Sequence, residues 1–270
     1  MSGTGSDTMQ SPVSPEAARA WIERWDIQQQ GYLPDREDRF TALIDAVEEA
    51  TGRPDPLVID LGCGPGSLAV RLLGRLPKAT VVAIDADPVL LTLGRAAWTA
   101  LPGLRFAEID LRTGDLAQSL DLERQPDAAV STTALHWLPR LALEGLYRQL
   151  AGLLRPGGVF LNGDHLREDP ETNPVLDRLG RGLIEREEHR RRTAGAVETW
   201  AGWWQAVSAD PELSVPVAAR TRLNLESEHH GSPASRLAVQ VAALRAAGFA
   251  EVGTLWQHGD NRLLCGVLAP

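Results

Sequence analysis

The sequence predicts an α/β fold in which a doubly wound sheet of seven strands lies beneath a helical lid. Short apolar runs alternate with helical patterns between residues 57 and 162, which is typical of a parallel sheet with helices on both faces. A tight turn at residues 259–261 joins the last two apolar runs. We therefore expect a mostly parallel sheet with an antiparallel last strand.

The expected elements follow from the apolar pattern and from the residues that interrupt it. Pro88 is typical of a helix start, and Gly248 is typical of the position just after a helix. The strands are expected at 57–61, 80–84, 104–109, 128–131, 159–162, 251–256 and 262–268. The helices that alternate with them are expected at 68–76, 88–101, 141–154 and 233–247.

Composition and pattern also divide the chain into segments. Residues 1–14 are rich in Ser, Gly, Thr and Pro and predict a disordered tail, with no signal peptide. Two helices at 15–30 and 35–51 are expected in an N-terminal lid segment, 15–52. The insertion at 166–232 is expected to hold helices near 174–190 and 196–207, followed by an irregular piece. The core then comprises 53–165 and the C-terminal part 233–270.

Composition excludes several classes of function. The chain has 270 residues and a formal net charge of −9, which disfavours binding to the phosphates of nucleic acids. No apolar stretch approaches the roughly 20 residues of a membrane span, so we expect no membrane insertion. Cys63 and Cys265 alone form neither a disulfide framework nor a zinc site. A cytoplasmic location is the expectation.

A glycine-rich loop between a strand and a helix is the strongest functional signal. The residues 58–67 read V-I-D-L-G-C-G-P-G-S, so a buried strand runs directly into glycines and then into a helix. Glycines allow the backbone to approach a ligand closely, and a helix N-terminus offers free N–H groups. Ligands of open α/β sheets bind at such strand ends.

Three aspartates, Asp60, Asp85 and Asp110, stand 25 residues apart near the ends of successive strands. Asp85 could accept hydrogen bonds from two ribose hydroxyls, and Asp110 could accept one from an adenine amino group. The alternative is that such aspartates cap the helices that follow them. We favour capping for Asp87, which precedes Pro88, and ligand binding for Asp85.

A nicotinamide dinucleotide is the first alternative ligand for this loop. Its fingerprint, G-x-G-x-x-G, needs a third glycine for close packing of the helix on the strand. Here Gly62, Gly64 and Gly66 alternate, and Ser67 stands at the third-glycine position. Asp60 would also repel a pyrophosphate, so a cofactor without one fits better.

These features together resemble class I S-adenosylmethionine (SAM)-dependent methyltransferases, of the trans-aconitate methyltransferase-like small-molecule group. The resemblance rests on five features: the loop at 60–66, the acid after the second strand, Asp110-Leu111, the L-R-P-G-G run at 154–158 and the reversed last strand. It covers residues 55–165 and 233–268, and it implies a Rossmann-like core, SAM as cofactor and S-adenosylhomocysteine as product. The cofactor contacts that it implies are Asp60, Gly62, Cys63, Gly64, Gly66, Asp85, Ala86, Asp110, Leu111 and Thr132.

The segment after the fourth strand, residues 131–139, reads S-T-T-A-L-H-W-L-P. In the family this position faces the transferred methyl group, and the segment is similar to the small-molecule enzymes that carry a polar residue before W-L-P. His136 is therefore a candidate catalytic base or substrate orienter, because its pKa lies near neutrality. The alternative, a histidine bonded to a backbone carbonyl at a helix start, stays open.

Further candidate substrate contacts are Tyr32, Arg36, Trp137, His165 and His229. In related folds, a segment placed like Tyr32 and Arg36 closes over the cofactor, where either residue could meet its carboxylate. We expect Trp137 to serve mainly in packing, as well as the tryptophans at helical spacing, Trp200, Trp203 and Trp204. No metal site is expected, since the adjacent histidines at 229–230 lack a third spaced ligand.

The function that we predict is methyl transfer from SAM, by in-line displacement, to an O, N or C atom of a small molecule in specialised metabolism. One alternative is an enzyme of the same fold that uses SAM for another reaction, such as a cyclisation. The other is a non-catalytic partner subunit. The sequence leaves open whether the protein is a monomer or a homodimer.

Overall fold

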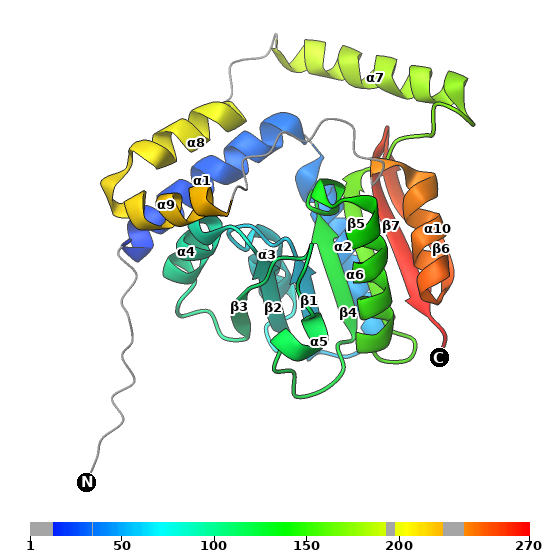
Figure 1. Cartoon of the computed structure of the whole chain (residues 1–270), viewed down its shortest axis with the longest axis horizontal. Coiled ribbons are helices and arrows are strands. Elements are labelled where there is room, and N and C mark those ends of the chain that lie inside the picture. Colours follow the sequence, from blue (N-terminus) through cyan, green and yellow to red (C-terminus); the bar gives the residue numbers. More distant parts are fainter. Residues whose placement is uncertain (1–12, 34, 193–197, 224–234) are drawn as a thin grey trace.

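The computed structural model describes residues 13–33, 35–192, 198–223 and 235–270. Its centre is one seven-stranded sheet in the order β3-β2-β1-β4-β5-β7-β6 (Figure 1). Only β7 runs antiparallel to its neighbours, which confirms the predicted fold class. The strands are β1 (Leu57–Leu61), β2 (Thr80–Asp85), β3 (Leu104–Glu108), β4 (Ala128–Thr132), β5 (Val159–His165), β6 (Phe249–His258) and β7 (Asn261–Leu268).

Helices cover both faces of the sheet and build a separate layer above one end of it (Figure 1). The core helices are α2 (Arg36–Thr51), α3 (Ser67–Arg75), α4 (Pro88–Ala97), α5 (Leu116–Ser119), α6 (Arg140–Leu153) and α10 (Leu237–Ala247). The others are α1 (Pro15–Tyr32), α7 (Pro174–Arg192), α8 (Trp200–Ala209) and α9 (Ser214–Arg222), with 3₁₀ turns η1 (Leu135–Trp137) and η2 (Pro211–Leu213).

Two apolar clusters fix the sheet between its helices. One joins β-strand side chains to α2 and α3 and includes Phe40 and Leu72; the other joins the opposite face to α6 and α10 and includes Tyr147 and Leu244. All five residues of β1 are buried, as expected for a strand that is covered on both faces. The central strands are thereby held rigidly, so the side chains at their ends have fixed positions.

The carboxyl ends of β1, β2, β4 and β5 lie at one edge of the sheet because these strands are parallel. The first residue of β7 lies at the same edge, since Asn261 pairs with His165 at the end of β5. This edge therefore collects side chains from five strands. Ligands of open α/β sheets bind at this position.

A third apolar cluster joins α1, α4, α8 and α9 and has the fully buried Trp203 near its centre. Figure 1 shows α8 and α9 lying beside α1, above α4. Helix α9 lies in the segment that was expected to be irregular, so that prediction was wrong. The preceding turn explains the start of α9, because Asp210 caps η2 by accepting a hydrogen bond from the Glu212 N–H.

Helix α10 also differs from the prediction, since it begins at Leu237 rather than at residue 233. An isolated bridge between Arg167 and Arg236 keeps the chain extended just before the helix. Residues 1–12 of the expected tail at 1–14 and His229 lie outside the described residues. The last two residues of that tail are ordered, since Val13 is buried and Ser14 caps α1 by accepting a hydrogen bond from the Ala17 N–H.

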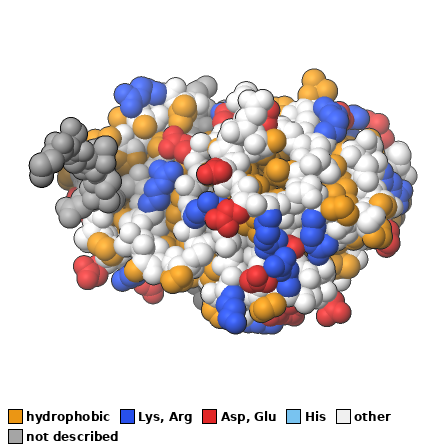
Figure 2. Space-filling view, turned by 90° about the horizontal axis from the view of Figure 1, so that it is seen from below, with side chains coloured by type: hydrophobic (Ala, Val, Ile, Leu, Met, Phe, Trp, Pro, Cys, Tyr) orange, Lys and Arg blue, Asp and Glu red, His pale blue; other side chains and the backbone are white. Residues whose placement is uncertain are grey.

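Helix α7 runs across the top of the molecule in Figure 1, and the C-terminus lies lower, at the right. Acidic and basic side chains are interspersed on the face seen from below in Figure 2. Arg53, Arg124 and Arg155 all lie within ion-pair distance of Asp127, which precedes β4. Among the helices that the structure describes, none is both long and apolar enough to cross a membrane.

Candidate active site

A cavity of about 520 Å³ opens above the carboxyl ends of β1, β2 and β4. The glycine loop and the ends of these strands form its floor, and α1, α2, α8 and α9 supply the opposite wall. Thirteen of the residues predicted as site residues line it: Tyr32, Arg36, Gly62, Cys63, Gly64, Asp85, Ala86, Asp110, Leu111, Thr132, His136, Trp137 and His165. Its volume lies within the range of small-molecule and cofactor sites.

Gly62 begins the floor and tolerates no side chain. Its φ is +68°, and a Cβ atom there would lie 2.3 Å from the Cβ of Ala134. The close approach brings the glycine loop against the segment that carries His136. The loop and the residues that follow β4 thus form one continuous surface.

Asp85 ends β2 and ties the loop to the next turn. Its Oδ2 accepts a hydrogen bond of 2.7 Å from the Gly64 N–H, and its Oδ1 accepts one of 2.9 Å from the Asp87 N–H. Burial, together with the nearby charge of Asp87, raises the pKa of Asp85 to about 6. The carboxylate still has lone pairs for further donors in the cavity.

Asp110 lies across the cavity on the loop after β3. Arg112 binds both of its carboxylate oxygens, and this hydrogen bonding holds the pKa of Asp110 below its usual value. The neighbouring Ile109 and Leu111 add apolar surface to the same wall. A flat ring with a polar edge fits between such surfaces.

Arg36 closes the cavity from the first turn of α2. Its guanidinium is 5% exposed, and its Nη2 lies 3.0 Å from Asp26 Oδ1. Its Nη1 has no hydrogen-bond partner among the described residues. Burial lowers the pKa of Arg36, and an anion at Nη1 would offset that cost.

His136 and Asp164 form a pair at the end of the cavity nearest β5. The Nδ1 atom of His136 lies 2.9 Å and 3.0 Å from the two oxygens of Asp164, which is fully buried. Burial alone would lower the pKa of His136, but the charge of Asp164 and the hydrogen bond to it raise that pKa above 6.5. With Nδ1–H donated to Asp164, the Nε2 of a neutral His136 is free to accept a proton.

Arg39 lies beneath this pair and is fully buried. It donates hydrogen bonds to Thr132 at the end of β4 and to Asn261 at the start of β7. Burial lowers the pKa of Arg39 to about 10, but the guanidinium still carries its charge at neutral pH. That charge helps to keep Asp164 ionised, and it moderates the rise in the pKa of His136.

Tryptophans form the wall opposite the floor. Trp25, Trp200 and Trp204 line the cavity and pack against one another, with ring centroids 5.2 Å apart for Trp25 and Trp200. Arg220 stacks on Trp204 at 3.7 Å and donates a 2.7 Å hydrogen bond to Asp87. These tryptophans therefore both pack and line the cavity, whereas the sequence pattern favoured packing alone.

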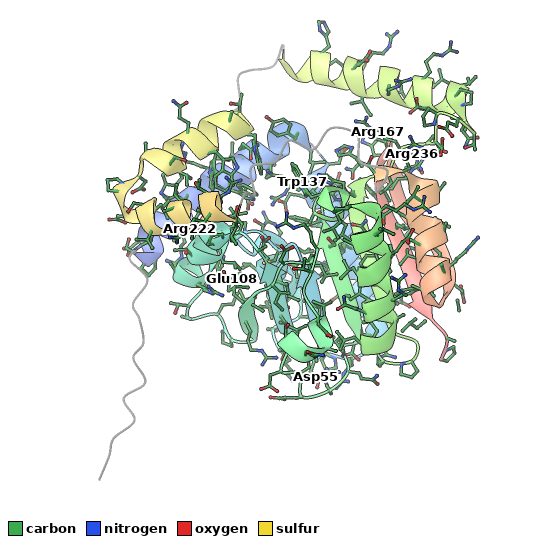
Figure 3. The ribbon with its side chains drawn as sticks, in the orientation of Figure 1. Asp55, Glu108, Trp137, Arg167, Arg222 and Arg236 are labelled. Atoms are coloured by element: carbon green, nitrogen blue, oxygen red, sulfur yellow. The ribbon has the colours of Figure 1, made fainter. Side chains whose placement is uncertain are left out.

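Two predicted cofactor residues do not line the cavity. Asp60 is fully buried under the loop because β1 lies between β2 and β4 and is covered on both faces, and burial with the nearby charge of Asp85 raises its pKa to about 7. Gly66 lies at the start of α3, where a Cβ atom would lie 2.9 Å from the ring of Phe106. Both residues support the loop from behind. Figure 3 shows Trp137, by contrast, above the sheet and below α7.

Several residues of the site were not identified from the sequence. Asp164 binds His136, whereas the predicted His165 binds Asp260 at 2.8 Å. Trp25 and Arg220 lie in helices whose spacing indicates only packing or solvation. Asp87 accepts hydrogen bonds from the Val89 and Leu90 N–H groups, so its predicted capping role is confirmed.

Comparisons with known proteins find similarity to methyltransferases. A family model described as a methyltransferase domain matches residues 58–158. The trans-aconitate 2-methyltransferase of Methylobacterium radiotolerans is 42% identical over 104 residues, which cover 38% of this chain and 36% of that protein. The enzyme of the same name from Methylobacterium nodulans is 34% identical over 136 residues, or 50% of this chain and 48% of that protein. The matched segments thus span less than half the length of these relatives.

Solved structures extend the likeness of the fold beyond the matched segment. An O-methyltransferase family protein from Burkholderia thailandensis superposes with a TM-score of 0.55 at 21% identity, covering 95% of this chain and 63% of that one. At that identity, the likeness concerns the fold alone. The family match over residues 58–158, the strand order and the glycine loop together identify a class I SAM-dependent methyltransferase domain in this chain.

Proposed function

We propose that the protein transfers a methyl group from SAM to a small molecule whose nucleophilic atom carries a proton. The observation that carries this proposal is the His136–Asp164 pair, which stands in the same cavity as the glycine loop and Asp85. A base at this place removes the proton of a hydroxyl, amine or acidic carbon as that atom attacks.

The residues of the cavity fit SAM. The Nη1 atom of Arg36 lies 3.8 Å from Glu37 but makes no hydrogen bond among the described residues, and it suits the carboxylate of the methionine part. A side chain at Gly62 would clash with Ala134, so the loop offers only its backbone there. Asp85 would hold the ribose, and Asp110 with the Leu111 amide would hold the adenine. SAM supplies a methyl group on a positively charged sulfur, and the tryptophan wall suits such a cation.

Substitution Arg36→Met tests the carboxylate contact. The variant removes one charge-assisted hydrogen bond, which contributes about 1.5–3 kcal/mol to binding. We therefore expect SAM to bind about 10- to 150-fold more weakly. Isothermal calorimetry measures this loss. The matched control is Arg75→Met, because Arg75 pairs with Asp45 and Glu48 on the outer side of α2 and α3. Equal losses in the two variants would contradict the assignment.

His136 gains two properties from Asp164. The hydrogen bond fixes the ring so that Nε2 is the free nitrogen, and the negative charge stabilises the imidazolium that forms when the proton arrives. Arg39 limits the second effect, because its positive charge opposes the rise in the pKa of His136. The backbone just before His136 is itself constrained, since Thr133 has a φ of +51°.

Substitution Asp164→Asn separates these effects. Removing the carboxylate leaves burial and Arg39 acting on His136, both of which lower its pKa, so the rise of activity with pH moves to lower pH. We expect the rate of methyl transfer to fall about 10- to 150-fold, as for loss of a hydrogen bond to a charged group. Rates measured between pH 5 and 9 check both effects. An unmoved pH profile would show that Asp164 does not act through His136.

In this proposal the methyl acceptor enters the cavity from the side of α7 and the tryptophan wall. We further propose that residues 15–52 and 166–232 act as a lid, since α1 and α8 already form the wall of the cavity opposite its floor. A closed wall excludes water from the reacting atoms. The acceptor then needs an apolar body that matches the tryptophans.

A carboxylate acceptor, as in the trans-aconitate 2-methyltransferases, is the second candidate. It needs no base, but it needs a cation, and Arg220 lies on the cavity wall. Incubation with SAM and a panel of hydroxyl, amine and carboxylate compounds, trans-aconitate included, tests both candidates through the S-adenosylhomocysteine formed. Acceptors that depend on His136 support the first candidate; a carboxylate methylated equally well by a His136→Asn variant supports the second. A SAM-using enzyme that does not methylate would form no S-adenosylhomocysteine.

A further inference from the structure

A second cavity, of about 530 Å³, lies between α7 and the turn that joins β6 to β7. It borders the first cavity through one side-chain pair, because His165 lines the first cavity and its partner Asp260 lines the second. Figure 3 shows Arg167, another lining residue, between α7 and the body of the molecule. The hydrogen-bonded His165–Asp260 pair therefore lies between the two cavities, and a ligand that occupies both must extend past this pair.

Arg262 is the residue of this cavity whose hydrogen bonding is incomplete. Its side chain is 9% exposed, and its Nη2 donates a 2.7 Å hydrogen bond to Glu168. Its Nε and Nη1 have no partner among the described residues. Buried donors without partners destabilise the protein, so a ligand that accepts hydrogen bonds from them is favoured.

The position of Arg262 connects it with the catalytic pair. Arg262 lies directly opposite Asp164 in the β5–β7 register, at the edge of the sheet where ligands bind. Opposite residues of an antiparallel pair have neighbouring side chains on the same face. The donors of Arg262 thus lie one strand away from the acid that holds His136.

The opposite wall of the second cavity is apolar. Leu176, Leu179 and Leu183 of α7 line it, and each is more than half exposed. The other charges there form pairs: Arg181 with Asp177, and Arg167 with Asp260 at 3.5 Å. Because these charges balance, a ligand is selected by short-range hydrogen bonds to Arg262 and by apolar contact with α7.

From these contacts we propose that the second cavity holds the carboxylate end of the methyl acceptor, with an apolar chain lying against α7. This inference rests on the proposed function, and it narrows the acceptor to carboxylic acids that carry an apolar chain. The carboxylate accepts from Nε or Nη1 of Arg262, while the atom to be methylated lies past His165, near His136.

Calorimetric titration of the full chain with octanoate and with octan-1-ol tests the inference, before and after saturation with S-adenosylhomocysteine. We expect octanoate to bind at least about tenfold more tightly than octan-1-ol, and Arg262→Met to abolish that preference. Arg245→Met is the matched control, because Arg245 lies exposed on α10 outside this cavity. Glu168→Gln is expected to tighten octanoate binding, since it removes a negative charge beside Arg262 and weakens the hydrogen bond that holds Nη2.

Equal binding of octanoate and octan-1-ol, no binding of octanoate, or an Arg262→Met protein that folds and keeps the preference would overturn the inference. Should Arg262→Met fail to fold, Glu168→Gln decides alone: unchanged or weaker octanoate binding contradicts the proposal. The titration with S-adenosylhomocysteine reports separately on the proposed function. Its success beside a failed octanoate titration would remove the second cavity from the account and leave the cofactor site intact.

Discussion

His136→Asn is expected to lower the rate of methyl transfer by about 10²- to 10⁴-fold while leaving the affinity for SAM within about twofold of the wild type. Asparagine keeps an N–H group that can donate to Asp164, but it has no atom that accepts a proton at neutral pH. The loss therefore isolates the function of Nε2 as a base. Initial rates of S-adenosylhomocysteine formation, with calorimetry for the affinity, measure both quantities.

The dependence of the rate on pH also tests whether His136 acts as the base. Asp164 raises the pKa of His136 above 6.5, so in the wild type the neutral, active form grows as the pH rises through that raised pKa. The rate should rise over the same range, and the rise should vanish in His136→Asn. The control is His258→Gln, since His258 pairs with Asp35 on an exposed surface away from the cavity. A His136→Asn enzyme with the wild-type rate would remove the base from the mechanism.

Asp85→Ala is expected to weaken SAM binding by about 30- to 150-fold, from about 2–3 kcal/mol for charge-assisted hydrogen bonds to the ribose. The substitution also frees the Gly64 N–H, which loosens the loop that faces the cofactor. Burial raises the pKa of Asp85 to about 6, and the ionised form is the better acceptor. The affinity of the wild type should therefore fall as pH drops through about 6.

Two further variants distinguish ribose binding by Asp85 from a general loss of structure. Asp85→Asn keeps one acceptor oxygen but loses the charge, so its affinity should fall less than that of Asp85→Ala and should not change near pH 6. Asp45→Ala, on the outer side of α2, should bind SAM as the wild type does. If Asp85→Ala binds SAM with unchanged affinity while its melting temperature is also unchanged, the ribose assignment is wrong.

The succession of strands and helices along the chain and the glycine loop were predictable because each depends on local pattern. Apolar runs of five or six residues identify β1 and β2, and the positive φ at Gly62 explains why a glycine stands there. Asp87 caps α4 through residues two and three positions away, so its role too is visible in the sequence. Each of these features depends only on residues that lie close together in the sequence.

The partner of His136 was not predictable for the opposite reason. Asp164 lies 28 residues further along the chain, and the register of β4 and β5 decides that it faces His136. Arg39 comes from α2, 93 residues before the site of its hydrogen bond at Thr132. No local spacing marks such contacts, since tertiary packing alone creates them.

The tryptophan wall shows a further limit. Trp200, Trp203 and Trp204 have the spacing of a packed helix face, and Trp203 is indeed fully buried. Trp200 and Trp204 flank it and line the cavity as well. Which member of such a stripe meets a ligand depends on how α8 sits against α1, and periodicity does not contain that information.

Calorimetric titration of the wild-type protein with SAM, S-adenosylhomocysteine and NAD tests the central claim most directly. The account predicts that the first two bind with dissociation constants on the order of micromolar, and that NAD does not bind. The reason for excluding NAD is the position of Ser67, where the dinucleotide fingerprint needs a third glycine. A folded protein that binds NAD, or that binds neither SAM nor S-adenosylhomocysteine, would contradict the account.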